Sequence, residues 1–127
     1  SCILLLHISV YVGGDSDLVC RCWVRVTAIY PSDVRDFYRK STKDFRFALR
    51  LEDMSGVVTA WACGMQAEQF LNMRACDLRS NESKAKKLRD QVRSLMSPCA
   101  WFSCCLFRSF GRAYIFGTSI IKKEVSD

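Results

Sequence analysis

The chain has 127 residues, of which half are apolar and a quarter are charged. This length fits one domain with a single core, and this composition excludes a disordered chain. The formal net charge of +6 favours an anionic partner, because lysine and arginine side chains that neutralise phosphates release counterions. Charge alone does not identify the partner, since in many basic domains it serves only solubility.

The eight cysteines raise the question of a disulfide framework or a metal site. The sequence contains no CxxC pair, and its one histidine, His7, lies in an apolar stretch, so the usual spacing of zinc ligands is missing. Several cysteines fall in segments with strand character, where a free thiol behaves as a small buried apolar group. We therefore expect reduced, structural thiols in an intracellular protein, with no metal and no cofactor.

Residues 1–17 form an apolar leader that ends in the turn-forming stretch GGDSD. The apolar run over residues 2–12 is too short to span a bilayer as a helix, which needs about 20 residues. It also lacks the basic start of a secretory signal. We expect an additional strand or the end of a fragment here, the domain proper over residues 18–121, a frayed tail over residues 122–127, and no membrane partner.

Three segments with strand character follow the leader. Residues 19–30 are rich in β-branched and aromatic side chains and stop at Pro31. Residues 45–51 alternate between apolar and polar side chains, which is typical of a half-buried strand. The turn-forming residues 52–56 join this segment to residues 57–63, so the last two segments are predicted to form a hairpin.

The clearest helix is predicted at residues 82–96, where apolar side chains recur at helical spacing until Pro98. Ser80 or Asn81 can cap its first turn, and its lysines and arginines fall mostly on the outer surface, as on an ordinary solvated helix. A shorter helical turn is favoured at residues 67–73.

Two further strands, residues 101–110 and 113–121, close the chain across Gly111-Arg112. The order strand, strand, strand, helix, strand, strand is that of the OB fold, a five-stranded Greek-key barrel. We therefore predict an all-β fold with one main helix, which lies between the third and fourth strands. In such barrels the second and third strands and the neighbouring loops usually present the binding groove.

Alternation places four side chains on the outside of the predicted hairpin. They are Arg46, Arg50, Thr59 and Trp61. Bases can stack on an indole while arginine holds the phosphates, and tryptophan and arginine are also common anchors for protein partners. The alternative is that Trp61 is packed under a terminal segment such as residues 2–12.

The loop over residues 32–43 interleaves basic and aromatic side chains. Its candidate contact residues are Arg35, Phe37, Tyr38, Arg39, Lys40 and Lys43. In OB folds this loop often folds over the ligand, so its two aromatic residues are candidates for stacking. The alternative is a polar loop whose aromatic residues only pin it to the barrel.

Sequence signatures of catalysis are missing. There is no GxGxxG, GxxxxGK[ST], HExxH or GxSxG motif, and the single histidine makes Cys-His or Ser-His catalysis a poor fit. The adjacent carboxylates Glu52 and Asp53 belong to a predicted turn rather than to an acid–base pair. We expect a non-enzymatic protein with no small-molecule substrate.

The blocks LEDMSG and VVTAWACGMQAEQFL, the basic helix, and the blocks WFSCCLFRSF and YIFGTSII resemble a known family. They are similar, in this order, to the C-terminal OB domain of protection-of-telomeres proteins, especially the plant type, over residues 18–121. No segment is long enough for the nuclease-like zinc insertion of animal members. The Gly111-Arg112 connection is also short for the family, which puts contacts through that loop in doubt.

The resemblance implies a telomere-associated protein as the first partner to expect, at chromosome ends in the nucleus. It implies single-stranded, G-rich telomeric DNA as the second. Two alternatives to a partner-binding module therefore stay open. The first is a direct single-strand binder, and the second is a truncated or aberrantly spliced fragment without independent function.

Overall fold

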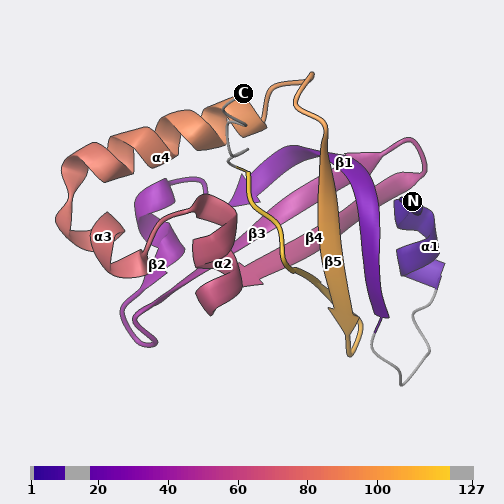
Figure 1. The fold of residues 1–127 in the computed structure, drawn as a ribbon, viewed down its shortest axis with the longest axis horizontal. Helices are drawn as coiled ribbons and strands as arrows, with labels where there is room; N and C mark the ends of the chain where they lie inside the picture. The colour runs from indigo at the N-terminus through magenta and orange to yellow at the C-terminus, as the bar shows by residue number, and fades with distance from the viewer. Residues whose placement is uncertain (1, 11–17, 121–127) are drawn as a thin grey trace, which may run out of the picture.

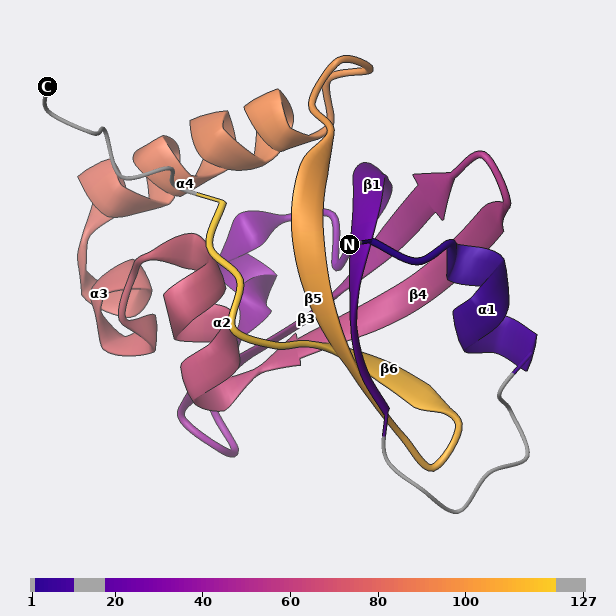
Figure 2. The ribbon, with the colours of Figure 1, turned by 45° about the vertical axis from the view of Figure 1, so that its right-hand side comes forward.

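The computed structural model describes residues 2–10 and 18–120 of the chain (Figure 1). The elements in chain order are α1 (Leu5–Val10), β1 (Leu18–Tyr30), the 3-10 helix η1 (Val34–Phe37), β2 (Tyr38–Arg39), β3 (Asp44–Asp53), β4 (Gly56–Cys63), α2 (Gly64–Leu71), α3 (Ala75–Ser80), α4 (Glu82–Leu95), β5 (Phe102–Ser109) and β6 (Arg112–Ile115). The helices α2, α3 and α4 gather at one end of the strands, and α1 packs at the opposite end (Figures 1 and 2).

Five of the strands close into a barrel. β1 pairs antiparallel with both β3 and β5, β3 with β4, and β5 with β6. The ring closes between β4 and β6, which run parallel where Trp61 stands beside Tyr114. β1 serves two neighbours because its register shifts between Val26 and Ala28, where a bulge bends the strand. This topology, with the helices between β4 and β5, is the OB fold that the sequence predicted.

The barrel interior follows the alternation that the sequence predicted for β3, because Phe45, Phe47, Leu49 and Leu51 are buried inside it. Ala48, on the outer side of the strand, is buried as well. The Phe47 ring stacks on Phe37, with ring centroids 4.6 Å apart, and lies 6.1 Å from Phe70 of α2. These rings join the loop after β1, the barrel and the helical end into one core.

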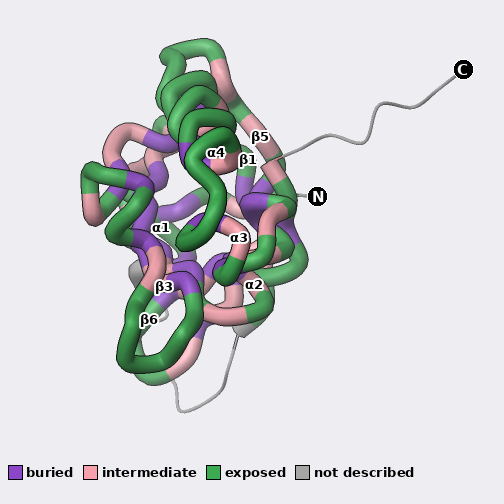
Figure 3. Tube along the Cα trace, turned by 90° about the vertical axis from the view of Figure 1, so that its left-hand side faces the viewer, coloured by how far each residue is buried: buried purple, intermediate pink, exposed green. Residues whose placement is uncertain are grey.

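The predicted helix over residues 82–96 is confirmed as α4. Its N-cap is Asn81, whose side-chain oxygen accepts hydrogen bonds from the backbone N–H groups of Ser83 at 3.0 Å and Lys84 at 3.3 Å. The helix is mostly exposed along its length (Figure 3). Residues 67–71 of the helical turn expected over residues 67–73 belong to α2, which ends at Leu71, whereas α3 and the short strand β2 were not predicted.

The described part of the leader is a helix, so the expectation of an additional strand there is wrong. Leu5 and Ile8 of α1 are buried in the core. The backbone N–H of Leu5 donates to the Asp53 carboxylate at 2.8 Å, and that of Leu6 donates to the Ser55 hydroxyl at 3.0 Å. The β3–β4 turn thus supplies acceptors for the first turn of α1. The rest of the leader and the predicted tail over residues 122–127 lie outside the described residues.

The last strand is shorter than predicted, because β6 ends at Ile115. After it, the backbone N–H of Gly117 donates to the Gln66 side chain at 2.7 Å and that of Ile120 donates to the Phe70 carbonyl at 3.0 Å. The chain after β6 therefore runs along α2 while it still contacts β5, because the Phe116 N–H donates to the Cys105 carbonyl at 3.0 Å and the ring centroids of Phe116 and Phe107 lie 6.4 Å apart. No helix in the described part of the chain is long and apolar enough to cross a bilayer.

Candidate functional site

The solvent side of the β3–β4 hairpin carries the four residues predicted for it. We call these residues, Arg46, Arg50, Thr59 and Trp61, the outer face. The register sets Arg50 opposite Thr59, and both side chains are exposed. Trp61 stands opposite Ala48, one position along the same side, and is half-buried. The structure therefore brings the predicted residues together on one surface.

Within the outer face, Arg46 lies over the indole of Trp61. The guanidinium carbon is 4.9 Å from the ring centroid, which is the geometry of a cation–π contact. The Arg46 Nε is buried and has no hydrogen-bond partner among the described residues. Burial that leaves a guanidinium N–H unmet has a cost, so a partner that offers an acceptor to Arg46 gains a hydrogen bond to a charged group.

Two hollows flank Trp61. The first has a volume of about 390 Å³, and the residues that line it include Ile8, Thr59, Arg108 and Arg112. The second has a volume of about 280 Å³ and is mainly aromatic. Its lining residues are Trp61, Cys63, Gln66, Phe107, Tyr114, Ile115 and Phe116. Ile8 of α1 borders the first hollow, yet Trp61 keeps part of its surface exposed, so α1 does not bury it.

The loop residue Phe37 is a correction to the sequence prediction. It is 0% exposed and stacked on Phe47, so its ring has no face left for a base or a partner. The alternative weighed for the loop, an aromatic residue that pins it to the barrel, describes Phe37. Tyr38 is half-buried, and the Arg79 guanidinium carbon lies 6.0 Å from its ring centroid.

The basic residues of the loop are divided between two settings. Arg35 forms an ion pair with Glu82 at the start of α4. Arg39, Lys40 and Lys43 are exposed. Burial raises the pKa of the Cys63 thiol, and the charges of Arg46 and Arg39 partly oppose this rise. Arg39 of the loop and Arg46 of the outer face therefore both lie close to Cys63, the last residue of β4. The loop and the outer face thus meet at this end of the strand.

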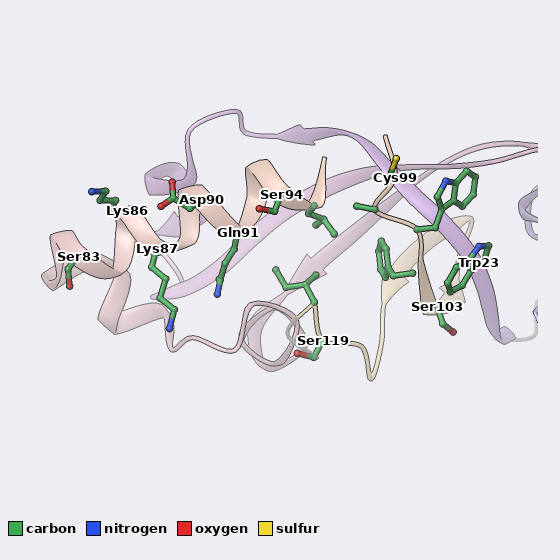
Figure 4. A pocket seen from close by; sticks show the side chains of 15 residues that line it. Trp23, Ser83, Lys86, Lys87, Asp90, Gln91, Ser94, Cys99, Ser103 and Ser119 are labelled. Carbon is green, nitrogen blue, oxygen red and sulfur yellow. The ribbon is translucent and has the colours of Figure 1, made fainter. Parts of the chain in front are cut away.

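A larger groove, which we call the α4 groove, was missed by the sequence reasoning. It has a volume of about 1080 Å³ and lies between α4, the start of β5 and the segment after β6 (Figure 4). Among its lining residues are Trp23 of β1 and Trp101 just before β5. The one available signal was in β1, where inward Cys22 and Val24 imply that Trp23 points outward.

The model of the family described as "POT1A-like, OB fold domain" matches residues 15–112, which is more than half of the chain. The chain belongs to this family. Protection of telomeres protein 1a of Arabidopsis thaliana is 29% identical over 115 residues, covering 80% of this chain and 25% of that protein. The chain therefore spans about a quarter of the length of this relative.

Among solved structures, a chain in the crystal structure of fission yeast Pot1 and Tpz1 superposes with a TM-score of 0.70. The match covers 95% of this chain and 92% of that chain at 16% identity, and it shows a shared fold. The OB domains of this family belong to telomere-protection proteins, which are not enzymes. The family thus confirms the prediction of a non-enzymatic protein.

The buried thiols of this POT1A-like domain face each other across β1 and β5. Cys22 and Cys104 are direct partners in the register, and both are fully buried. Burial raises the pKa of Cys104 to about 12 and raises that of Cys22 well above its usual value. No group of three or more His, Cys, Asp or Glu residues in the described chain could hold a metal ion.

Proposed function

We propose that this chain is a telomere-protection OB domain that binds a partner telomere protein through its outer face. In this proposal it corresponds to the C-terminal OB domain of plant-type protection-of-telomeres proteins and contributes to chromosome-end capping in the nucleus. The observation that carries the proposal is the contact of Arg46 with Trp61 between two hollows. A partner side chain inserted into either hollow would touch the indole.

Three observations favour a protein over a nucleic acid at the outer face. β5 and β6 are joined by Phe110 and Gly111 alone, so no second loop rises to enclose a strand opposite the loop over residues 32–43. The Arg46 guanidinium also occupies one side of the indole on which a base would stack. Phe110 at the tip of that turn is 100% exposed and adds an apolar contact for a protein partner. The structure of the fission yeast proteins supports the proposal, since Pot1 and Tpz1 were solved together.

The test is calorimetric titration of the chain with the Tpz1-type telomere protein of the same organism. Trp61→Ala is expected to weaken binding by at least about tenfold, because tryptophan anchors at interface centres typically contribute 2 kcal/mol or more. Arg50→Ala is expected to weaken binding as well. Arg74→Ala is the matched control, since Arg74 is an exposed arginine at the start of α3 and is not one of the four residues of the outer face. Loss of binding in the control, or none in Trp61→Ala, would contradict the proposal.

Direct binding of G-rich single-stranded DNA is the second candidate function. It is favoured by the exposed side chains of Arg39, Lys40 and Lys43 in the loop and of Arg50 on the same side of the hairpin as Trp61. Anisotropy titration with a labelled G-rich single strand at two salt concentrations separates the two functions. Tight, steeply salt-dependent binding that is lost in Trp61→Ala and Arg50→Ala supports the DNA function. No binding at low salt removes it.

A further inference from the structure

We propose that the α4 groove is a second, separate interface that binds an acidic peptide segment with a bulky apolar anchor, supplied by a partner protein. The groove shares no residue with the outer face. The proposal therefore holds whether the outer face binds a protein or DNA. It depends on three features of the groove: its apolar end, its cationic end and an unmet acceptor between them.

The apolar end is formed by two tryptophans. Trp23 is 53% exposed and Trp101 is 37% exposed, although both are large apolar side chains. A separate hollow of about 330 Å³, next to the α4 groove, continues from these two rings to Leu4 and Met54. The exposed apolar surface is therefore continuous. Contiguous apolar surface of this kind, beside a groove, marks an interaction site more often than isolated apolar side chains do. A bulky apolar side chain of a partner would fill it.

The cationic end is on α4. Lys86 and Lys87 line the groove, and Arg89 and Arg93 border the adjoining hollow. Two carboxylates accompany these four cations, since Asp90 lines both the groove and the hollow and Glu82 lines the hollow. Among the described residues, the salt bridges of α4 engage Glu82 and Lys84 instead, with Arg35 and Asp77. The excess of positive charge at this end complements an acidic segment.

The unmet acceptor is the side-chain oxygen of Gln91. Gln91 lines the groove, and its Oε1 atom is buried and accepts no hydrogen bond from the described residues. A buried acceptor without a partner is unfavourable. Once the Gln91 side chain turns towards the groove, the backbone N–H of an inserted peptide segment can satisfy this oxygen, whereas a phosphate oxygen, which is only an acceptor, cannot.

The layout of the groove favours a peptide over a nucleic acid strand. Lys86 and Lys87 lie at one end and Trp23 at the other (Figure 4). A single strand carries a phosphate beside every base, so a site for it places cations and aromatic rings along the same track. Separate cationic and apolar ends fit a segment whose acidic part and apolar part are also separate. Arg25, whose guanidinium carbon lies 5.9 Å from the centroid of the Trp101 ring, is already paired with Glu52 at 3.0 Å.

The test begins with selection of displayed random peptides on the full chain. The displayed peptides have about 12 residues, which extend over about 40 Å at about 3.3 Å per residue. The enriched sequences are expected to combine Asp or Glu with Trp, Phe or Leu. A labelled peptide of this kind should bind at least about tenfold more weakly to Trp101→Ala and to Lys86→Glu/Lys87→Glu, and as tightly as before to Trp61→Ala. Trp23→Ala, at an exposed position, is a second apolar variant in case Trp101→Ala does not fold, and Arg74→Glu is the control for charge reversal.

Several results would overturn the inference. They are the absence of enriched peptides, enriched peptides without acidic residues, and binding that depends on Trp61 rather than on Trp101 and Trp23. Displacement of the peptide by a labelled oligothymidine whose own binding is lost in Trp101→Ala would assign the groove to nucleic acid. Because Trp61→Ala is the test of the proposed function and the control here, failure of one proposal is distinguishable from failure of the other.

Discussion

The guanidinium carbon of Arg46 lies 4.9 Å from the centroid of the Trp61 ring, so β3 and β4 are joined on their solvent side by a cation–π contact. The two residues are diagonal neighbours, because Trp61 stands opposite Ala48 in the register. Ala48 between them is buried although it belongs to the outer side of β3. The contact therefore fixes the orientation of the indole before any partner arrives.

This contact predicts an energetic coupling between the two side chains. In a double-mutant cycle with Arg46→Met and Trp61→Leu, the coupling in the free energy of unfolding is expected to be about 0.5–1 kcal/mol. Chemical denaturation of the four proteins measures it. The control cycle combines Trp61→Leu with Arg50→Met, because Arg50 stands opposite Thr59. Equal coupling in both cycles would show that Arg46 does not rest on the indole in solution.

The docking of α1 predicts a large difference between two adjacent leucines. Leu5 is fully buried, so Leu5→Ala is expected to lower the free energy of unfolding by about 2–5 kcal/mol. Leu6 is half exposed, and Leu6→Ala is expected to change it by less than about 0.5 kcal/mol. The same curves test the alternative of a fragment without independent function, which predicts a broad, non-cooperative transition. Similar losses in both variants would contradict the packing of α1.

The parts of the fold that could be predicted are those with a local signal. The period of two in β3 and the period of about 3.6 in α4 come from neighbouring residues, so the barrel strands and the main helix were found from sequence. The outer face followed from the same alternation. The pairing of β3 with β4 could be predicted from the turn between them, since a hairpin pairs two strands that are consecutive in the sequence.

The parts that could not be predicted depend on distant residues. α1 is short, and the groups that accept its first N–H hydrogen bonds belong to Asp53 and Ser55, 48 and 49 residues away. Phe37 looks like an exposed loop aromatic until Phe47 is placed beside it. The α4 groove is missed for the same reason, because Trp23, Trp101 and Lys87 come from three separate segments.

The Asp53 carboxylate predicts how stability depends on pH. Partial burial acts to raise its pKa, but hydrogen bonds from Ser55, Leu5 and Gly56 outweigh burial, so the pKa lies below its usual value. A depressed pKa in the folded state gives stability that is present above the unfolded value, about 4, and is lost as pH falls through the folded value. Asp53→Ala is expected to lower the free energy of unfolding by about 1–2 kcal/mol at neutral pH.

Denaturation curves at several pH values check this prediction. The difference between wild type and Asp53→Ala should shrink as the pH falls below about 4, because the carboxylate is protonated first in the unfolded state and, at lower pH, in the folded state. Asp90→Ala, at an exposed position on α4, is the control and should show little difference at any pH. A constant difference across the pH range would mean that the charge of Asp53 does not stabilise the turn.

The buried thiol pair predicts a sharp separation in cysteine reactivity. A thiol reagent attacks the thiolate, and with a pKa of about 12 only about one Cys104 thiol in ten thousand is ionised at pH 8. Cys22 and Cys104 are also closed to solvent, so both should be labelled only when denaturant is added. Cys76 and Cys99 are exposed and should react within the first minutes, and Cys63 should follow more slowly because its pKa is raised.

Mass spectrometry of peptides from the labelled protein measures the order of reaction. Labelling of Cys104 as fast as that of Cys76 would contradict the burial of Cys104 beside Cys22 in the paired strands β1 and β5. Because both buried thiols pack in the core as small apolar groups, Cys22→Ser should be less stable than wild type, whereas Cys76→Ser should not. If instead Cys22 and Cys104 resisted labelling even in denaturant and became reactive after reduction, they would be joined in a disulfide, and the expectation of reduced structural thiols would be wrong.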